Sequence, residues 1–230
     1  MDALVSVIIP TYNRFHQLLY AIDSVKKQTY SNIEIIIVND GSTDNKYNYH
    51  KFEGCRIFNI KDNTKQMYNY PGLGYIRTLG MKQANGKYIA FLNDNDYWLP
   101  NKIQIQVEVL NKYTFCEMIC SNAYIGNGSY NDDKEFPLVY DRTNLINIYK
   151  DKDYLIDGDV LHKWTYDFLK VHNFCITSSV MITNDLLKKV NYIDNIKPPG
   201  ECYHCWLKVI QFTECYYIDK PLIYNDSSIN

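Results

Sequence analysis

The sequence lacks the segments that would place it in a membrane or on a nucleic acid. No apolar run approaches the ~20 residues that a membrane-spanning helix needs, and the N-terminus carries no basic segment followed by a cleavage site. Lys and Arg (24) nearly balance Asp and Glu (26), giving a formal net charge of −2, without the basic excess of a general nucleic-acid binder. We expect a soluble, cytoplasmic protein with no transmembrane segment and no nucleic-acid partner.

Regularly spaced cysteine and internal repeats are also missing. The seven Cys residues stand in apolar or irregular surroundings without the spacing of a disulfide scaffold, which indicates reduced thiols. Cys202 and Cys205 form one C-x-x-C pair, but a structural zinc site needs a second ligand pair. No repeat or linker divides the 230 residues, of which 46% are hydrophobic. The chain is therefore predicted to form a single α/β domain over residues 1–230.

Strands and helices are predicted to alternate along the first hundred residues. Compact apolar runs are typical of strands buried on both faces of a parallel sheet, and they occur at Leu4–Ile9, Ile33–Val38, Tyr88–Leu92 and, more weakly, Cys55–Ile60. Helices are expected at Arg14–Gln28 and Leu73–Ala84, and no regular element at Asp62–Tyr70. A doubly wound sheet binds ligands beyond the carboxyl ends of its strands, where Asp40 and Asp94 stand.

The second half has weaker patterns. Helices are expected from Pro100 to Tyr113, Val160 to Val171, Asn184 to Val190 with Asn184 as cap, and about Glu201 to Phe212. Strands are expected at Cys116–Cys120 and within Ile176–Ile182, and Gly126–Glu135 is rich in turn formers.

The most informative polar cluster is Asn93-Asp94-Asn95-Asp96, at the end of a predicted buried strand. Packing at such a place excludes unpaired charge unless a cation or hydrogen-bond donors compensate for it. Mg²⁺ and Mn²⁺ favour carboxylate oxygen and often bind through one or two carboxylates while substrate phosphates complete the shell. The cluster therefore predicts a metal and diphosphate site, with a helix-capping acidic turn as the alternative.

Three ordered motifs then carry a resemblance to a known family. They are Val5-Ser6-Val7-Ile8-Ile9-Pro10-Thr11-Tyr12-Asn13-Arg14, Val38-Asn39-Asp40-Gly41-Ser42-Thr43-Asp44 and Gly86-Lys87-Tyr88-Ile89-Ala90-Phe91-Leu92-Asn93-Asp94-Asn95-Asp96. On these residues the chain resembles the family 2 glycosyltransferases. The resemblance implies a single GT-A domain with a Rossmann-like, mostly parallel central sheet flanked by helices. Residues 1–100 would form the nucleotide-sugar-binding half, and residues 101–230 a smaller acceptor-side half.

The resemblance also implies a nucleoside pocket. Its lining would include Pro10, Thr11, Tyr12 and Arg14. Asp40 would accept a hydrogen bond from the base, with uracil N3 as the expected donor. An ionised carboxylate only accepts, so it suits a ring N–H, although Asp in an Asp-Gly turn is also typical of a local cap.

At the diphosphate end, the resemblance assigns Arg77, Asn93 and Asp94 to the nucleotide or its ribose. Arg on a helix is more often solvated or salt-bridged. Asp94 and Asp96 would hold a Mn²⁺ or Mg²⁺ ion that bridges the two phosphates, with Asp96 as the principal ligand. Asn at positions 93 and 95 departs from the family's fuller acidic pattern and reduces the expected negative charge.

An inverting transfer also needs a base that removes the proton of the acceptor hydroxyl. Glu201 matches the first acid of the family's Glu-Asp segment, whereas Cys202 replaces the second. Glu201 is therefore the predicted base, with His204 as another proton acceptor. The alternative for Glu201 is a carboxylate that interacts with the positive end of its helix.

Together these features predict an inverting, metal-dependent transferase that moves a sugar from a nucleotide-diphosphate sugar, a UDP-sugar above all, to a hydroxyl of a glycan, protein or lipid. The alternative is a catalytically impaired module that only binds nucleotide sugar, because Cys202 interrupts the acidic pair. A nucleotidyltransferase is less favoured, since the chain has no Gly-rich triphosphate loop.

Overall fold

The computed structural model describes residues 2–141, 155–157 and 161–228. The first elements are, in chain order, β1 (Val5–Thr11), α1 (Phe15–Lys26), β2 (Ile33–Asn39), α2 (Lys46–Tyr49), β3 (Cys55–Asn59), α3 (Thr64–Tyr68), α4 (Leu73–Lys82), β4 (Tyr88–Phe91) and β5 (Tyr97–Trp98). The later elements are α5 (Lys102–Lys112), β6 (Met118–Gly126), β7 (Leu155–Asp157), β8 (Leu161–Trp164), α7 (Tyr166–Val171), the 3₁₀ helix η1 (Thr177–Ser179), β9 (Met181–Thr183), α8 (Asn184–Lys189), α9 (Glu201–Val209) and β10 (Cys215–Asp226).

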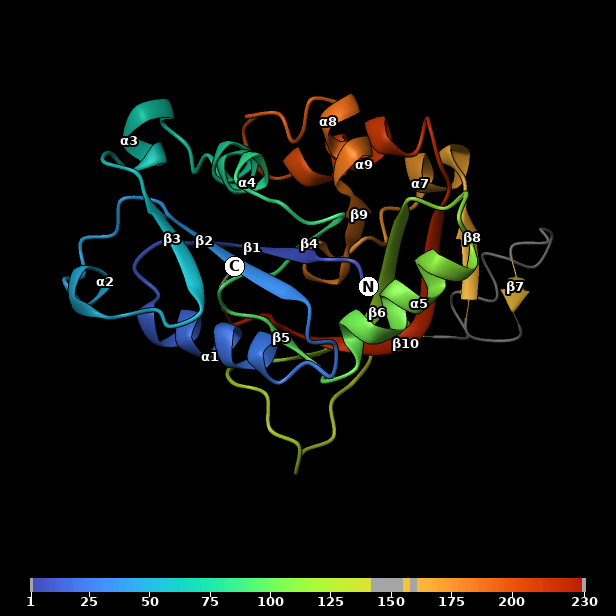
Figure 1. The fold of residues 1–230 in the computed structure, drawn as a ribbon, viewed down its shortest axis with the longest axis horizontal. Coiled ribbons are helices and arrows are strands. Elements are labelled where there is room, and N and C mark those ends of the chain that lie inside the picture. Colours follow the sequence, from blue (N-terminus) through green and yellow to red (C-terminus); the bar gives the residue numbers. More distant parts are fainter. Residues whose placement is uncertain (1, 142–154, 158–160, 229–230) are drawn as a thin grey trace.

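One sheet organises these elements, in the order β3-β2-β1-β4-β9-β6-β10-β8-β7, with β5 paired to β10 (Figure 1). Strands β3, β2, β1 and β4 pair in parallel, so their carboxyl ends meet at one edge. β9 runs antiparallel between β4 and β6, and β10 pairs in parallel with β6. The predicted α/β class is confirmed, and β1 to β4 of the predicted nucleotide half pair with one another in parallel.

Helices cover both faces of this sheet, which explains why its central strands are apolar throughout. Helices α1 and α5 lie on one face, and α4, α8 and α9 on the other (Figure 1). All seven residues of β1 are buried, and neighbours alternate between the faces: Val7 packs with the α1 side and Ile8 with the α4 side. Burying one such side chain stabilises the fold by about 1.5–3 kcal/mol.

Close packing fixes the position of α4. A Cβ atom at Gly74 would lie 2.2 Å from the carbonyl oxygen of Asp194, and one at Gly80 would lie 2.7 Å from Cγ2 of Ile8. Real Cβ atoms do not approach other atoms so closely, so larger residues would push the helix away from the sheet and from the 193–195 segment. Glycine therefore holds α4, which carries Arg77, in place.

Two segments of the first half differ from the predictions. β1 continues through Pro10 to Thr11, because its ladder with β4 has already ended at Ile8 and no N–H is required on that side. The stretch Asp62–Tyr70 contains the short helix α3. Its N-terminus is capped by Asn63, whose side chain accepts from the N–H of Lys65.

The predicted helix over Val160–Val171 is wrong in its first part. Within the described residues, β8 runs to Trp164 and α7 begins only at Tyr166, with the Thr165 hydroxyl accepting from the N–H of Phe168. β8 pairs antiparallel with β10, from which it is separated by about fifty residues of chain. Such pairing leaves no local periodic signal.

Other element boundaries in the second half also differ from the predicted ones. η1 occupies Thr177–Ser179, so the predicted strand starts only at Met181. Asn184 is the first residue of α8 rather than its cap, and its amide donates to the carbonyl of Gly86. β10 was not predicted. Its register with β6 shifts on both sides of Pro221, which has no N–H to donate.

No helix in the described part of the chain is long and apolar enough to cross a membrane.

Candidate active site

A cavity of about 520 Å³ opens where β1, β2 and β4 end, as predicted for a ligand site. Its volume suits a small molecule, since such sites span roughly 300–1,000 Å³. Most of the predicted site residues line it, namely Pro10, Thr11, Tyr12, Arg14, Asp40, Arg77, Asn93 and Asp94. Asp96 and Glu201 do not line it.

Sequence reasoning missed the residues that close the cavity from other segments. Asn63 and Lys65 come from the start of α3, and Asn225 and Asp226 from the end of β10. Asn95 completes the polar lining. The Asn63-Thr64 pair carried a helix-start signal, whereas nothing local placed the end of β10 beside the end of β4.

Asp40 follows β2 and holds the start of α3. Its two carboxylate oxygens accept from the N–H of Thr64 at 2.8 Å and from the Thr64 hydroxyl at 2.6 Å. Burial raises the pKa of Asp40, and the two bonds from Thr64 oppose that rise. The carboxylate thus caps a neighbouring helix, and its remaining lone pairs stay free for a donor in the cavity.

The first motif shapes the same end of the cavity. The Thr11 hydroxyl and the Tyr47 hydroxyl lie 2.9 Å apart, and the Tyr47 hydroxyl accepts from the N–H of Arg14 at 3.0 Å. Both Thr11 and Tyr47 are buried. In contrast, Tyr12 lines the cavity with 42% of its surface exposed, so one aromatic ring is available to a ligand.

Asp94 and Arg14 form an ion pair in the cavity wall. Nη1 of Arg14 donates to Oδ1 of Asp94 at 3.1 Å. Asp94 is buried, whereas the Arg14 side chain retains 36% exposure. Burial raises the pKa of Asp94, and the positive charge of Arg14 opposes the rise. The pair offers both a cation and a carboxylate to a ligand.

Arg77 joins three predicted functional positions. Its Nη1 donates to Oε1 of Glu201 at 3.0 Å and lies 3.2 Å from Sγ of Cys202, while Nη2 donates to Oδ1 of Asn93 at 3.0 Å. Glu201 is only 6% exposed, at the first turn of α9. Arg77 is thus salt-bridged and also lines the cavity, whereas its contact with a nucleotide stays a prediction.

Asp96 is fully buried and saturated with donors. Oδ1 accepts from the Asn225 amide and the N–H of Asp226, both at 3.0 Å. Oδ2 accepts from the Ser178 hydroxyl and, at 3.1 Å, from the Asn93 amide. Burial raises the pKa of Asp96 to about 6 in spite of these donors. The geometry makes this carboxylate a connector between the ends of β4 and β10.

The formal charges around the cavity balance. Three cationic residues line it, Arg14, Lys65 and Arg77, together with three acidic ones, Asp40, Asp94 and Asp226. The acidic residues come from the ends of β2, β4 and β10, so negative charge is spread along the cavity rather than gathered at one point. A dianionic ligand would therefore be attracted by individual cationic side chains and not by an overall positive charge of the cavity.

Comparison with known proteins accords with this architecture. The profile of the family described as Glycosyl transferase family 2 matches residues 6–168. An uncharacterized glycosyltransferase of Rickettsia typhi is 31% identical over 225 residues, which cover 96% of this chain and 63% of that relative. The chain thus spans less than two thirds of that relative.

Two further similar proteins are described with a uridine-diphosphate sugar. The UDP-Glc:alpha-D-GlcNAc-diphosphoundecaprenol beta-1,3-glucosyltransferase WfaP of Escherichia coli is 31% identical over 183 residues, covering 70% of this chain and 71% of that protein. The crystal structure of S. aureus TarS 1-349 in complex with UDP-GlcNAc shares the fold with a TM-score of 0.72 at 17% identity, covering 99% of this chain and 59% of that one. The profile match and the WfaP alignment show that the chain belongs to glycosyl transferase family 2.

Proposed function

We propose that this chain transfers a sugar from a UDP-sugar to a hydroxyl acceptor, with inversion at the anomeric carbon. The observation that carries the proposal is the single cavity that joins Asp40, at the end of β2, to Asp94 and Arg14. It has room for a nucleotide sugar at the carboxyl edge of a parallel sheet. The UDP-Glc in the name of the E. coli relative and the UDP-GlcNAc bound to TarS support uridine as the nucleoside.

At the nucleoside end, Asp40 would accept the N3–H of uracil. Thr64 uses only part of the acceptor capacity of the carboxylate, so a third hydrogen bond fits its chemistry. Tyr12 presents an exposed ring beside it, and aromatic rings pack well against planar bases. A charge-assisted bond in this buried place contributes about 1.5–3 kcal/mol.

At the diphosphate end, Arg14 and Lys65 would meet the phosphate oxygens. Both line the cavity, and a guanidinium group matches the geometry of phosphate oxygens. Arg14 would have to share its contact with Asp94, so donor binding is expected to rearrange this ion pair. The two cations would offset the negative charge that grows on the diphosphate as it leaves.

A divalent ion fits this end through Asp94. Mg²⁺ commonly uses one or two carboxylates together with substrate phosphates, and Asp94 lines the cavity beside the amides of Asn93 and Asn95. Metal binding by Asp96 stays a prediction, and it would require that carboxylate to give up at least one of its four donors. When bound, the ion would act as a Lewis acid toward the leaving diphosphate.

Glu201 would serve as the base. Its carboxylate is held by Arg77, which keeps it oriented and offsets its charge in a buried place. The acceptor hydroxyl must approach within about 3 Å of it for proton transfer. Because Glu201 does not line the cavity, the acceptor would reach it from the side of α9 rather than through the nucleotide end.

One observation favours a second candidate function, a module that binds nucleotide sugar without transferring it. Sγ of Cys202 lies 3.2 Å from Nη1 of Arg77, where the family's second acid would place a carboxylate. Burial raises the pKa of this thiol, and the Arg77 charge opposes the rise. A neutral thiol would be a poor base at this position.

Release of UDP from UDP-glucose, UDP-GlcNAc and UDP-galactose tests the proposal, with Mn²⁺, with Mg²⁺ and with a chelator. The wild-type protein should release UDP from at least one donor. Asp94→Asn removes the charge of the cavity carboxylate and should lower kcat/KM about 10- to 100-fold. Asp133→Asn, on an exposed loop, is the matched control and should behave as wild type.

The proposal would be wrong if no donor were turned over and Asp94→Asn left donor binding unchanged. Binding of UDP-sugar without any turnover would support the binding module instead.

A further inference from the structure

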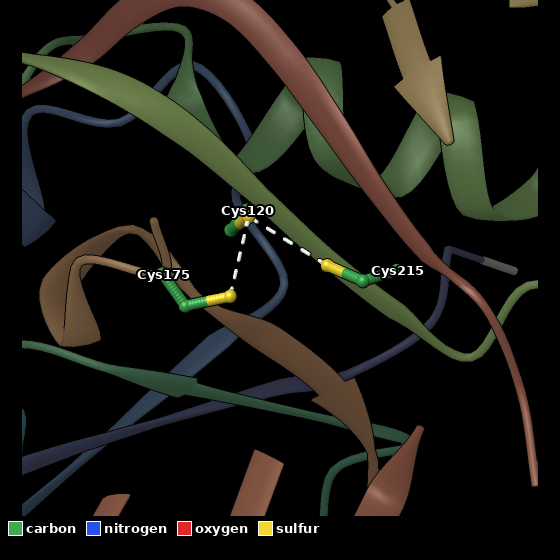
Figure 2. Close-up of side chains that lie close together, drawn as sticks. All are labelled: Cys120, Cys175 and Cys215. Atoms are coloured by element: carbon green, nitrogen blue, oxygen red, sulfur yellow. Dashed lines mark hydrogen bonds between the residues drawn. The ribbon is translucent and has the colours of Figure 1, made fainter. Parts of the chain in front are cut away.

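Three thiols meet inside the core, away from the cavity. Cys120 lies on β6, Cys215 begins β10, and Cys175 lies in the segment between α7 and η1. Figure 2 shows the side chains of Cys175 and Cys215 pointing toward Cys120. Sγ of Cys120 lies 3.8 Å from Sγ of Cys175 and 3.6 Å from Sγ of Cys215, and all three sulfurs lie within 4.8 Å of one another.

These distances distinguish the cluster from a disulfide. A disulfide needs sulfurs about 2.05 Å apart, and none of the seven cysteines, all in the described ranges, forms one. Sulfur ligands of a tetrahedral ion with bonds of about 2.3 Å lie about 3.8 Å apart. The two measured separations are close to that value, so an ion needs little movement of the backbone to reach all three sulfurs.

The other buried thiols behave differently. Sγ of Cys116 points to the carbonyl of Met118 at 3.0 Å, and Sγ of Cys205 points to the carbonyl of Tyr192 at 3.5 Å. These are the usual contacts of a thiol that fills space in a core. Cys120, Cys175 and Cys215 place their sulfurs against one another from three separate segments, and only Cys215 among these three also has a carbonyl contact within the described residues, at 3.7 Å to Tyr216.

A buried lysine, Lys102, interacts electrostatically with Cys120 and bears on the charge of such a site. Three thiolates and one divalent ion carry a net charge of −1, which needs compensation in a core. Nζ of Lys102 is fully buried and has no hydrogen-bond partner among the described residues. Burial lowers the pKa of Lys102 well below its usual value, and the charge of a Cys120 thiolate opposes this effect. Its contact is the ring of Trp98, 3.9 Å from Nζ. A protonated Lys102 would bring the net charge to zero.

We propose that Cys120, Cys175 and Cys215 bind one Zn²⁺ ion as thiolates, in a site separate from the sugar-nucleotide cavity. Each thiol loses its proton to solvent as the sulfur–zinc bond forms, with no change of oxidation state. The three ligands leave one position of the tetrahedron for a water molecule. The ion ties β6 and β10 to the segment that leads into η1.

The site is closed to solvent, so the ion must enter as the chain folds. The test is therefore to refold the reduced protein with Zn²⁺, remove loosely held metal with a mild chelator, and measure zinc per chain by mass spectrometry. One equivalent is expected. Refolding with Co²⁺ should give the thiolate-to-metal charge-transfer absorption of a three-sulfur site.

Each of Cys120→Ser, Cys175→Ser and Cys215→Ser should lose the bound ion. Cys205→Ser, a buried thiol outside the cluster, is the matched control and should retain it. Circular dichroism confirms folding of each variant, and the alanine substitution replaces any serine variant that does not fold. The readout is metal content, so it is independent of sugar transfer.

The proposal is overturned if the refolded wild type holds no zinc after chelator treatment. It is also overturned if a folded Cys175→Ser or Cys175→Ala variant retains one equivalent.

Discussion

Charged side chains in and behind the cavity wall are held in pairs of opposite sign. Asp94 pairs with Arg14 and Glu201 with Arg77, and three of these four residues are buried. Removing one partner of a buried pair leaves an uncompensated charge and costs about 3–5 kcal/mol. Alanine would therefore report on folding as much as on chemistry, and isosteric amides are the better probes of function.

Glu201→Gln should separate chemistry from structure. The amide oxygen can still accept from Arg77, but it cannot take a proton from the acceptor, so kcat should fall about 10²- to 10⁴-fold. The Kd for UDP should stay within about threefold of wild type. Steady-state kinetics and calorimetry measure the two effects, and Glu108→Gln on the exposed side of α5 is the control.

A purely structural Glu201 would instead weaken UDP binding and turnover together. The binding-module alternative has a different signature: wild-type protein without turnover, and a gain of activity in Cys202→Asp, which puts a carboxylate beside Arg77.

At the scale of elements, Asp96 joins segments that are distant in sequence. It follows β4, and it accepts hydrogen bonds from Ser178 in η1 and from Asn225 and Asp226 at the end of β10. Three of its partners, Asn93, Asn225 and Asp226, line the cavity. The resemblance to a metal-binding motif pointed to Asp96 as an important carboxylate. In the structure, its hydrogen bonds hold the segments of the cavity wall together.

Asp96 also predicts how stability depends on pH. Its folded pKa of about 6 lies above the value of about 3.9 for an unfolded Asp. The folded state therefore binds more protons than the unfolded state between these values. The contribution of Asp96 to the free energy of unfolding is fully present below about pH 4 and is lost as the pH rises through about 6.

The size of this loss is about 3 kcal/mol. Urea denaturation measures the free energy of unfolding, which should fall between about pH 4 and about pH 7. The fall should be smaller by this amount in Asp96→Asn than in wild type. Asp133→Asn should show the same fall as wild type. An identical pH dependence in Asp96→Asn and wild type would refute the assignment.

The same contrast between local and distant contacts explains what the sequence could predict. β1, β2 and β4 are continuous apolar runs because both of their faces are covered, and α1 and α4 show helical spacing because one side of each is buried. β8 and β10 owe their structure to pairing across long stretches of chain. Neither an alternation of apolar and polar residues nor turn-forming residues in the sequence indicate such pairing.

For the whole molecule, the parallel half of the sheet made the site predictable. Thr11 ends β1, and Asp40 and Asp94 follow the adjacent parallel strands β2 and β4, so topology alone brings them to one edge. Asn225 and Asp226 arrive there only because β10 pairs with β6 and β5. Lys65 lines the cavity because Asp40 and Asn63 cap α3, a contact that spacing does not reveal.

The length of the chain, compared with its relatives, bears on which activity it is expected to show. It spans 63% of the Rickettsia typhi relative and 59% of the TarS chain, while the described residues include the cavity proposed for the donor. Donor binding is therefore the property that this domain should show by itself.

Calorimetric titration with UDP in the presence of Mg²⁺ tests the central claim, that this cavity binds a uridine diphosphate. We predict one UDP per chain, tighter binding of UDP than of GDP, and a Kd about 10- to 100-fold higher in Asp40→Asn, because the variant loses the charged acceptor for the base. Absence of UDP binding to the wild type, or equal affinity in Asp40→Asn, would contradict the account.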